Sequence, residues 1–194
     1  MRRLAALVVV LGSCSSGQGG RSAETPRQVQ AREEATTAFK AWRDCTAAGE
    51  VERHYDMLSY SMISDWLFRR LQSGDRPAQE WRSSLTGRRV RTDLDLWLGF
   101  CERNAASSPS GRAALLPSEV LAEPSLRVLY RDYFMREIEK VKLYMDGLSS
   151  PVVAVDSTGV TVTVKNNQGN LEAYAMVHER GAWKVDGFRP EGGR

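Results

Sequence analysis

The chain has 194 residues, of which 42% are hydrophobic and 26% charged. This composition is ordinary for a globular protein with one well-packed core and does not indicate disorder. The formal net charge of +3 includes Arg2 and Arg3; without these two, 25 of the 27 basic residues remain against 24 acidic ones, a balance that argues against a nucleic-acid partner.

Residues 1–13 have the three parts of a secretion signal. Arg2 and Arg3 form a basic start, the run from Leu4 to Leu11 is apolar, and Gly12 and Ser13 are small enough for a signal peptidase. The apolar run is shorter than the about 20 helical residues that cross a membrane. It therefore predicts export without a permanent transmembrane helix.

The stretch Leu11-Gly12-Ser13-Cys14 resembles the lipobox of bacterial lipoproteins. The resemblance implies cleavage before Cys14 and attachment of a diacylglyceryl group to its thiol, so that acyl chains hold the protein at a membrane. With Ser15 next, it implies the outer membrane, facing the periplasm, if the host is Gram-negative. The alternative is an ordinary secretory signal with an incidental cysteine, cut nearer Gly20.

Residues 14–24 contain the cysteine and then a stretch rich in serine and glycine, without large apolar side chains. Such a segment cannot repay the entropy cost of ordering and is typical of a flexible tether. We expect a single folded domain over residues 25–194.

The first part of this domain is predicted to be helical. Thr25, Pro26 and Gln28 have the pattern of a capped helix start, apolar residues follow at three- and four-residue spacing, and Gly49 can end the helix. Further helices are predicted at 50–73, with a break near Ser59 to Ser61, and at 77–85, 93–104 and 124–147. The basic run from Arg88 to Arg91 is interpreted as a solvated loop between helices, with an anion site as the alternative.

After Pro151 the pattern changes to short strands at 152–155, 160–165, 171–179 and 182–188. In "GVTVTVKN" the residues Val160, Val162 and Val164 alternate with polar ones, which predicts one apolar face. Four strands joined by tight turns predict an antiparallel meander, which the preceding helices must cover.

Cys45 and Cys101 would lie in an oxidising compartment after export, where an even pair favours a disulfide bond. The alternative is two buried free thiols. No set of cysteines and histidines has metal-ligand spacing, so we expect no metal or other cofactor.

Helices followed by a meander resemble the NTF2-like, or cystatin-like, α+β family. The matching stretches are "AFKAWRDCTAAGE", "VERHYDMLS", "GVTVTV" and "AYAMVHERGAWKVDGF". The resemblance implies a cone with a pocket between helices and sheet. The chain departs from the pattern at residues 66–104, where the resemblance predicts only a short helix and a first strand.

The resemblance directs attention to five side chains that could line the pocket: His54, Tyr55, Asp56, Tyr174 and Met176. A histidine buried beside Asp56 or Asp186 could transfer a proton. His54 and His178, however, both lie among charged residues, which favours a solvated surface for each.

Three functions fit these features. The first is a membrane-anchored, non-catalytic envelope lipoprotein that binds a small apolar ligand or a partner protein. The second is an NTF2-like enzyme that uses His54 and Asp56 as acid and base. The third is a structural surface lipoprotein with a solid interior. The sequence contains no recognisable catalytic motif, which favours the first.

Overall fold

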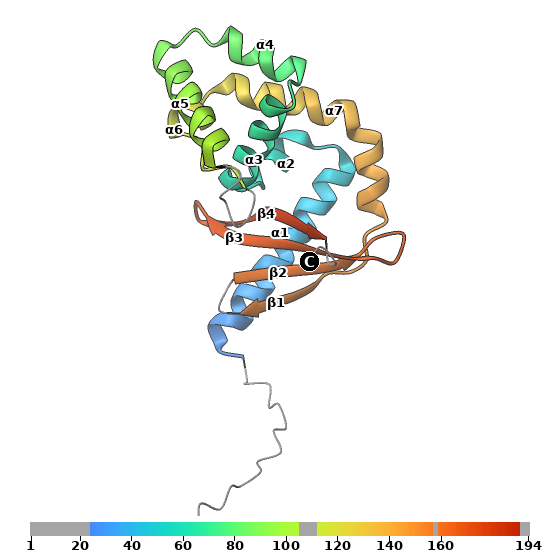
Figure 1. Cartoon of the computed structure of the whole chain (residues 1–194). Coiled ribbons are helices and arrows are strands. Elements are labelled where there is room, and N and C mark those ends of the chain that lie inside the picture. Colours follow the sequence, from blue (N-terminus) through green and yellow to red (C-terminus); the bar gives the residue numbers. More distant parts are fainter. Residues whose placement is uncertain (1–23, 105–111, 157–158, 191–194) are drawn as a thin grey trace, which may run out of the picture.

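The structure, a computed structural model, describes residues 24–104, 112–156 and 159–190. Helices come first and strands last (Figure 1): α1 (Pro26–Ala48), α2 (Val51–Asp56), α3 (Tyr60–Gln72), α4 (Arg76–Ser84), α5 (Arg88–Asn104), α6 (Ser118–Leu121), α7 (Pro124–Asp146), β1 (Val152–Asp156), β2 (Gly159–Lys165), β3 (Leu171–Glu179) and β4 (Ala182–Pro190). The predicted α+β class is confirmed, and the arrangement is consistent with an NTF2-like one. The predicted signal and Cys14 lie outside the described residues.

Helix α1 begins and ends as its sequence predicts. The Thr25 side chain accepts a hydrogen bond from the Gln28 backbone N–H at 3.3 Å, and the Gln28 side chain accepts one from the Thr25 N–H at 2.9 Å, a reciprocal capping box. Gly49 ends the helix with φ of +76°, a conformation that favours glycine.

The predicted break in the second helical stretch is confirmed at Ser59, which caps α3 by accepting the Met62 N–H at 3.0 Å. Just before it, Leu58 pairs with Val185, because the Ser59 N–H donates to the Val185 carbonyl and the Val185 N–H donates to the Met57 carbonyl, each at 2.9 Å. This short link fixes the α2–α3 junction against β4 and covers part of that strand's edge.

The four strands form an antiparallel sheet in the order β1-β2-β3-β4, the predicted meander. Val160, Val162 and Val164 lie opposite Met176, Tyr174 and Glu172, so these six residues share one face, and all are buried. Helix α1 crosses the sheet and contacts β1, β2 and β4, while α7 packs on α1 and α2. The apolar face therefore has the helical cover that the sequence requires.

Helices α4, α5 and α6 lie at the end of the molecule away from the sheet (Figure 1). Residues Arg88 to Arg91, predicted to be a loop, instead form the first turn of α5. Arg89 pairs with Glu119 at 2.8 Å and lies 3.8 Å from Asp93, while Arg91 donates to the Ser83 carbonyl. The predicted loop is therefore wrong, whereas the predicted solvation is confirmed, because Arg88, Arg89 and Arg91 are exposed.

The predicted disulfide is wrong, because Cys45 and Cys101 are both free and buried. The Cys45 sulfur lies on α1, 3.2 Å from the Trp42 carbonyl and 3.9 Å from the Met57 sulfur. Cys101 lies on α5, where the Ala114 backbone is its hydrogen-bond neighbour. Burial raises the pKa of each thiol, which keeps both protonated and unreactive.

We expect both thiols to react with iodoacetamide after unfolding without a reductant, since neither is bonded in the fold. Peptide mapping should find Cys45 and Cys101 alkylated after denaturation and protected before it. A linked peptide that contains both residues would contradict the structure.

Candidate functional site

The five predicted pocket residues lie in different surroundings. His54, Tyr174 and Met176 are buried, whereas Asp56 is exposed. The Phe39 and Trp42 rings lie with their centroids 5.2 and 5.5 Å from that of Tyr174, and the Trp42 ring is 5.8 Å from that of His54. Aromatic side chains therefore occupy the space between α1 and the sheet at this level.

His54 is buried in a chain of hydrogen bonds, so the prediction of a surface position is wrong. Its Nδ1 is 2.6 Å from the Thr46 hydroxyl, and its Nε2 is 2.8 Å from the Tyr130 hydroxyl. Thr46 donates its proton to the Trp42 carbonyl at 2.5 Å, so we assign the Nδ1–H tautomer, which donates to Thr46 and accepts from Tyr130. Every proton in this chain then has an acceptor. Burial lowers the pKa of His54 to about 4.

Asp56 does not face His54. Its carboxylate pairs with Arg127 at 2.5 Å on the exposed side of α2, and Arg127 also pairs with Glu52 at 3.1 Å and lies over the Tyr55 ring. Tyr55 is buried with its ring edge-on to Tyr130, and burial raises its pKa to about 12. The acid–base pair of His54 and Asp56 is therefore not formed.

Tyr174 belongs to a second buried polar cluster, formed with Glu172, Tyr144 and Asn166. Glu172, which is buried, accepts hydrogen bonds from the hydroxyls of Tyr144 and Tyr174 and, at 2.8 Å, from the Asn166 amide. Burial raises the pKa of both tyrosines, that of Tyr144 to about 12. Neutral donors thus hold a buried carboxylate where α7 meets β3.

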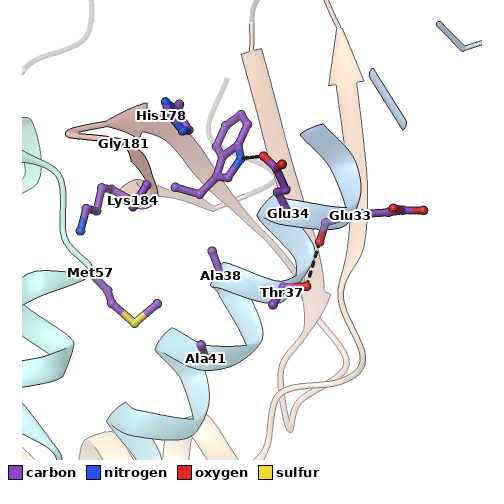
Figure 2. A pocket seen from close by; sticks show the side chains of 11 residues that line it. Glu33, Glu34, Thr37, Ala38, Ala41, Met57, His178, Gly181 and Lys184 are labelled. Atoms are coloured by element: carbon purple, nitrogen blue, oxygen red, sulfur yellow. Dashed lines mark hydrogen bonds between the residues drawn. The ribbon is translucent and has the colours of Figure 1, made fainter. Parts of the chain in front are cut away.

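An open groove lies between α1 and the β3–β4 hairpin (Figure 2). Glu34, Ala38 and Ala41 are four and three residues apart and so lie along one face of α1. Because two of them are alanines, the helix leaves room beside the hairpin. The groove has a volume of about 620 Å³, and its other lining residues include Met57, His178, Trp183 and Lys184.

Two contacts with the start of α3 hold the β3–β4 hairpin in its place beside α1. The turn residues Arg180 and Gly181 have φ of +55° and +75°, as a tight two-residue turn requires. The Arg180 guanidinium lies 3.9 Å from the centre of the Tyr60 ring, and the Tyr60 N–H donates to the Glu179 carboxylate at 3.1 Å. The start of α3 therefore fixes the hairpin end and, with it, Trp183.

Trp183 joins the two walls of the groove. Its indole N–H donates to the Glu34 carboxylate at 3.1 Å (Figure 2), across 149 residues of sequence. His178 lies opposite Trp183 in the sheet, with ring centroids 5.5 Å apart and an edge-to-face arrangement. The predicted surface position of His178 is confirmed, since it is exposed.

The sequence interpretation missed most of this groove. Its one usable signal is on α1, where the exposed Glu34 precedes the small residues Ala38 and Ala41 on a shared face. On the hairpin wall, Trp183 is half-buried, and its contact with Glu34 has no local signal in the sequence.

Comparisons of the chain with protein-family models, with curated proteins and with solved structures gave no match. In residues 24–104, 112–156 and 159–190, no helix is long and apolar enough to span a membrane. The same residues contain no group of three or more histidine, cysteine, aspartate or glutamate side chains placed to bind a metal ion. The groove is therefore interpreted from its geometry and chemistry alone.

The burial of His54 predicts a pH-dependent stability. An unfolded histidine takes up a proton near pH 6.5, whereas the folded one does so only near pH 4, so the free energy of unfolding should fall as the pH drops through this range. The full loss from this group is about 3 kcal/mol. Urea unfolding between pH 7 and 4.5 measures it.

The two histidines of the chain provide a matched control. His54→Gln should flatten the dependence between pH 6.5 and 5, where few carboxylates titrate, whereas the exposed His178→Gln should retain it. Equal slopes in the two variants would show that His54 is not the titrating group.

Proposed function

We propose that this chain is a lipid-anchored protein of a bacterial cell envelope whose domain binds a small ligand without catalysing a reaction. The groove between α1 and the β3–β4 hairpin carries the binding part of the proposal. Its volume of about 620 Å³ is within the about 300–1,000 Å³ typical of small-molecule sites. The lining combines apolar surface with a few polar groups, as such sites do.

The interior of the domain is less suited to a ligand than the groove. Hydrogen bonds link the buried side chains of His54, Tyr130 and Thr46, so that each polar group has a partner. Glu172 accepts hydrogen bonds from three further side chains. A ligand there would have to displace buried hydrogen bonds and close-packed rings, which is costly. We therefore assign binding to the groove and not to the interior of the cone.

The anchor and the groove share an element. The predicted tether of residues 14–24 leads into α1, and Glu34 lies about 12 Å along the helix from Pro26 at the usual rise per residue. Fully extended, a tether of this length reaches about 40 Å. The groove would thus remain near the membrane to which Cys14 is attached.

Replacement of the anchor residue tests the location. In a bacterium that acylates exported proteins, Cys14→Ser should shift the chain from the detergent-rich to the aqueous phase and remove the mass of the acyl groups. Ser15→Ala is the control and should leave both unchanged. An unmodified Cys14 in the membrane-extracted wild type would contradict the anchor.

A bulky residue in the groove tests the binding site. In native mass spectrometry, the protein extracted from its own membrane should retain a small molecule, and Ala38→Phe should lose it because the ring fills the space beside the hairpin. Ala48→Phe places the same side chain at an exposed position of α1 outside the groove, and this variant should retain the molecule. If Ala38→Phe retains the small molecule, the binding site is not this groove.

A further inference from the structure

The groove contains a fixed negative charge. One oxygen of the Glu34 carboxylate accepts from the Gln30 amide at 2.8 Å and the other accepts from the Trp183 indole at 3.1 Å. These two hydrogen bonds lower the pKa of Glu34, so the group is an anion at neutral pH. Both donors are uncharged, so they orient the carboxylate without neutralising it.

Among the residues that the structure describes, no lysine or arginine forms an ion pair with this charge, although the imidazole of His178, which lines the same groove, lowers the pKa of Glu34 when it is charged. Within 24–104, 112–156 and 159–190, Glu34 has no salt-bridge partner, although many of the other acidic residues there have one. The Lys184 ammonium points away from Glu34 and donates to the main-chain carbonyl of Asp56 (Figure 2). The side chain of the neighbouring Glu33 extends away from Ala38 and Met57 (Figure 2), but Glu33 also lines the groove and adds a second acidic side chain to it.

The surface around the carboxylate favours one kind of cation. Ala38, Ala41 and Met57 offer methyl groups and a thioether, and Trp183 offers an indole ring beside the carboxylate. A metal ion would need several oxygen ligands in place of its water shell. A quaternary ammonium ion has no N–H groups and is weakly hydrated, and its methyl groups can lie against an indole and an apolar floor while the charge faces a carboxylate.

We propose that the groove binds an organic ammonium ion, with Glu34 as the counter-ion and Trp183 as the aromatic surface against the alkyl groups. This assignment rests on the proposed binding function and names the class of ligand. Free amines and phospholipid headgroups both present this chemistry, and they differ in that a headgroup also carries a phosphate.

The probe is choline, compared with 3,3-dimethylbutan-1-ol, in which a carbon atom replaces the nitrogen and the shape is retained. The full chain in a non-ionic detergent is titrated while NMR follows the Trp183 indole N–H, assigned with Trp183→Phe. Choline should bind about fivefold more tightly than the neutral alcohol, the effect expected for one exposed charge and one aromatic contact. If phosphocholine binds as tightly as choline, the result favours a lipid headgroup as the ligand. If phosphocholine binds more weakly than choline, the result favours a free amine.

Two exposed glutamates, one that lines the groove and one outside it, give the matched variants. Glu34→Gln retains an acceptor for Trp183 and removes the charge, so it should reduce the preference for choline to about twofold, the share of the aromatic contact, and leave the alcohol unaffected. Glu102→Gln removes an equal charge from an exposed position of α5 outside the groove and should retain the preference. Equal binding of choline and the alcohol, an unchanged preference in Glu34→Gln, or no binding of choline would each overturn the ammonium assignment. The groove itself is judged separately, by the ligand that Ala38→Phe loses in native mass spectrometry.

Discussion

The packing of α1 across the apolar face of the sheet is the contact on which the rest of the structure depends. The sheet presents a row of buried valines on β2, and α1 covers it with Ala35, Phe39 and Trp42. Removal of this apolar surface from water is the main favourable contribution to folding. Because the buried face of α1 includes large aromatic rings, the flank with Ala38 and Ala41 is where the hairpin can approach the helix and leave a groove.

The polar groups in the core support this packing by linking elements far apart in the sequence. The hydrogen bonds from Tyr130 through His54 to Thr46 connect α7, α2 and α1, and those around Glu172 connect α7 to β3 and to the turn before it. A buried polar group without a partner is costly, so each network favours one arrangement of the helices over others of similar apolar content. Neutral His54 is consistent with this structural role.

Local sequence signals predicted the helices and strands well. The features that the sequence did not predict depend on contacts between residues far apart in the chain. The Thr25–Gln28 capping box, Gly49 and the alternation of Val160, Val162 and Val164 each depend on a few neighbouring residues, and all are confirmed. The burial of His54 depends on Tyr130, 76 positions away, and the groove depends on a contact between Trp183 and Glu34 across 149 positions. Likewise the charges around His54 suggested solvent, whereas helix packing buries its ring; Arg88 to Arg91 are solvated as predicted, but on a helix and not in a loop.

The position of the groove follows from how its two walls are supported. The α1 wall is fixed by the core, and the hairpin wall by Arg180 and Glu179 on Tyr60, so neither wall needs a ligand to hold it in place. The indole N–H of Trp183 donates to Glu34, and this hydrogen bond orients the carboxylate before any ligand binds. Preorganised groups lower the entropy cost of binding. The aromatic packing and the preformed surface groove are therefore two results of the same arrangement, since the rings between α1 and the sheet also fix the helix that forms the groove.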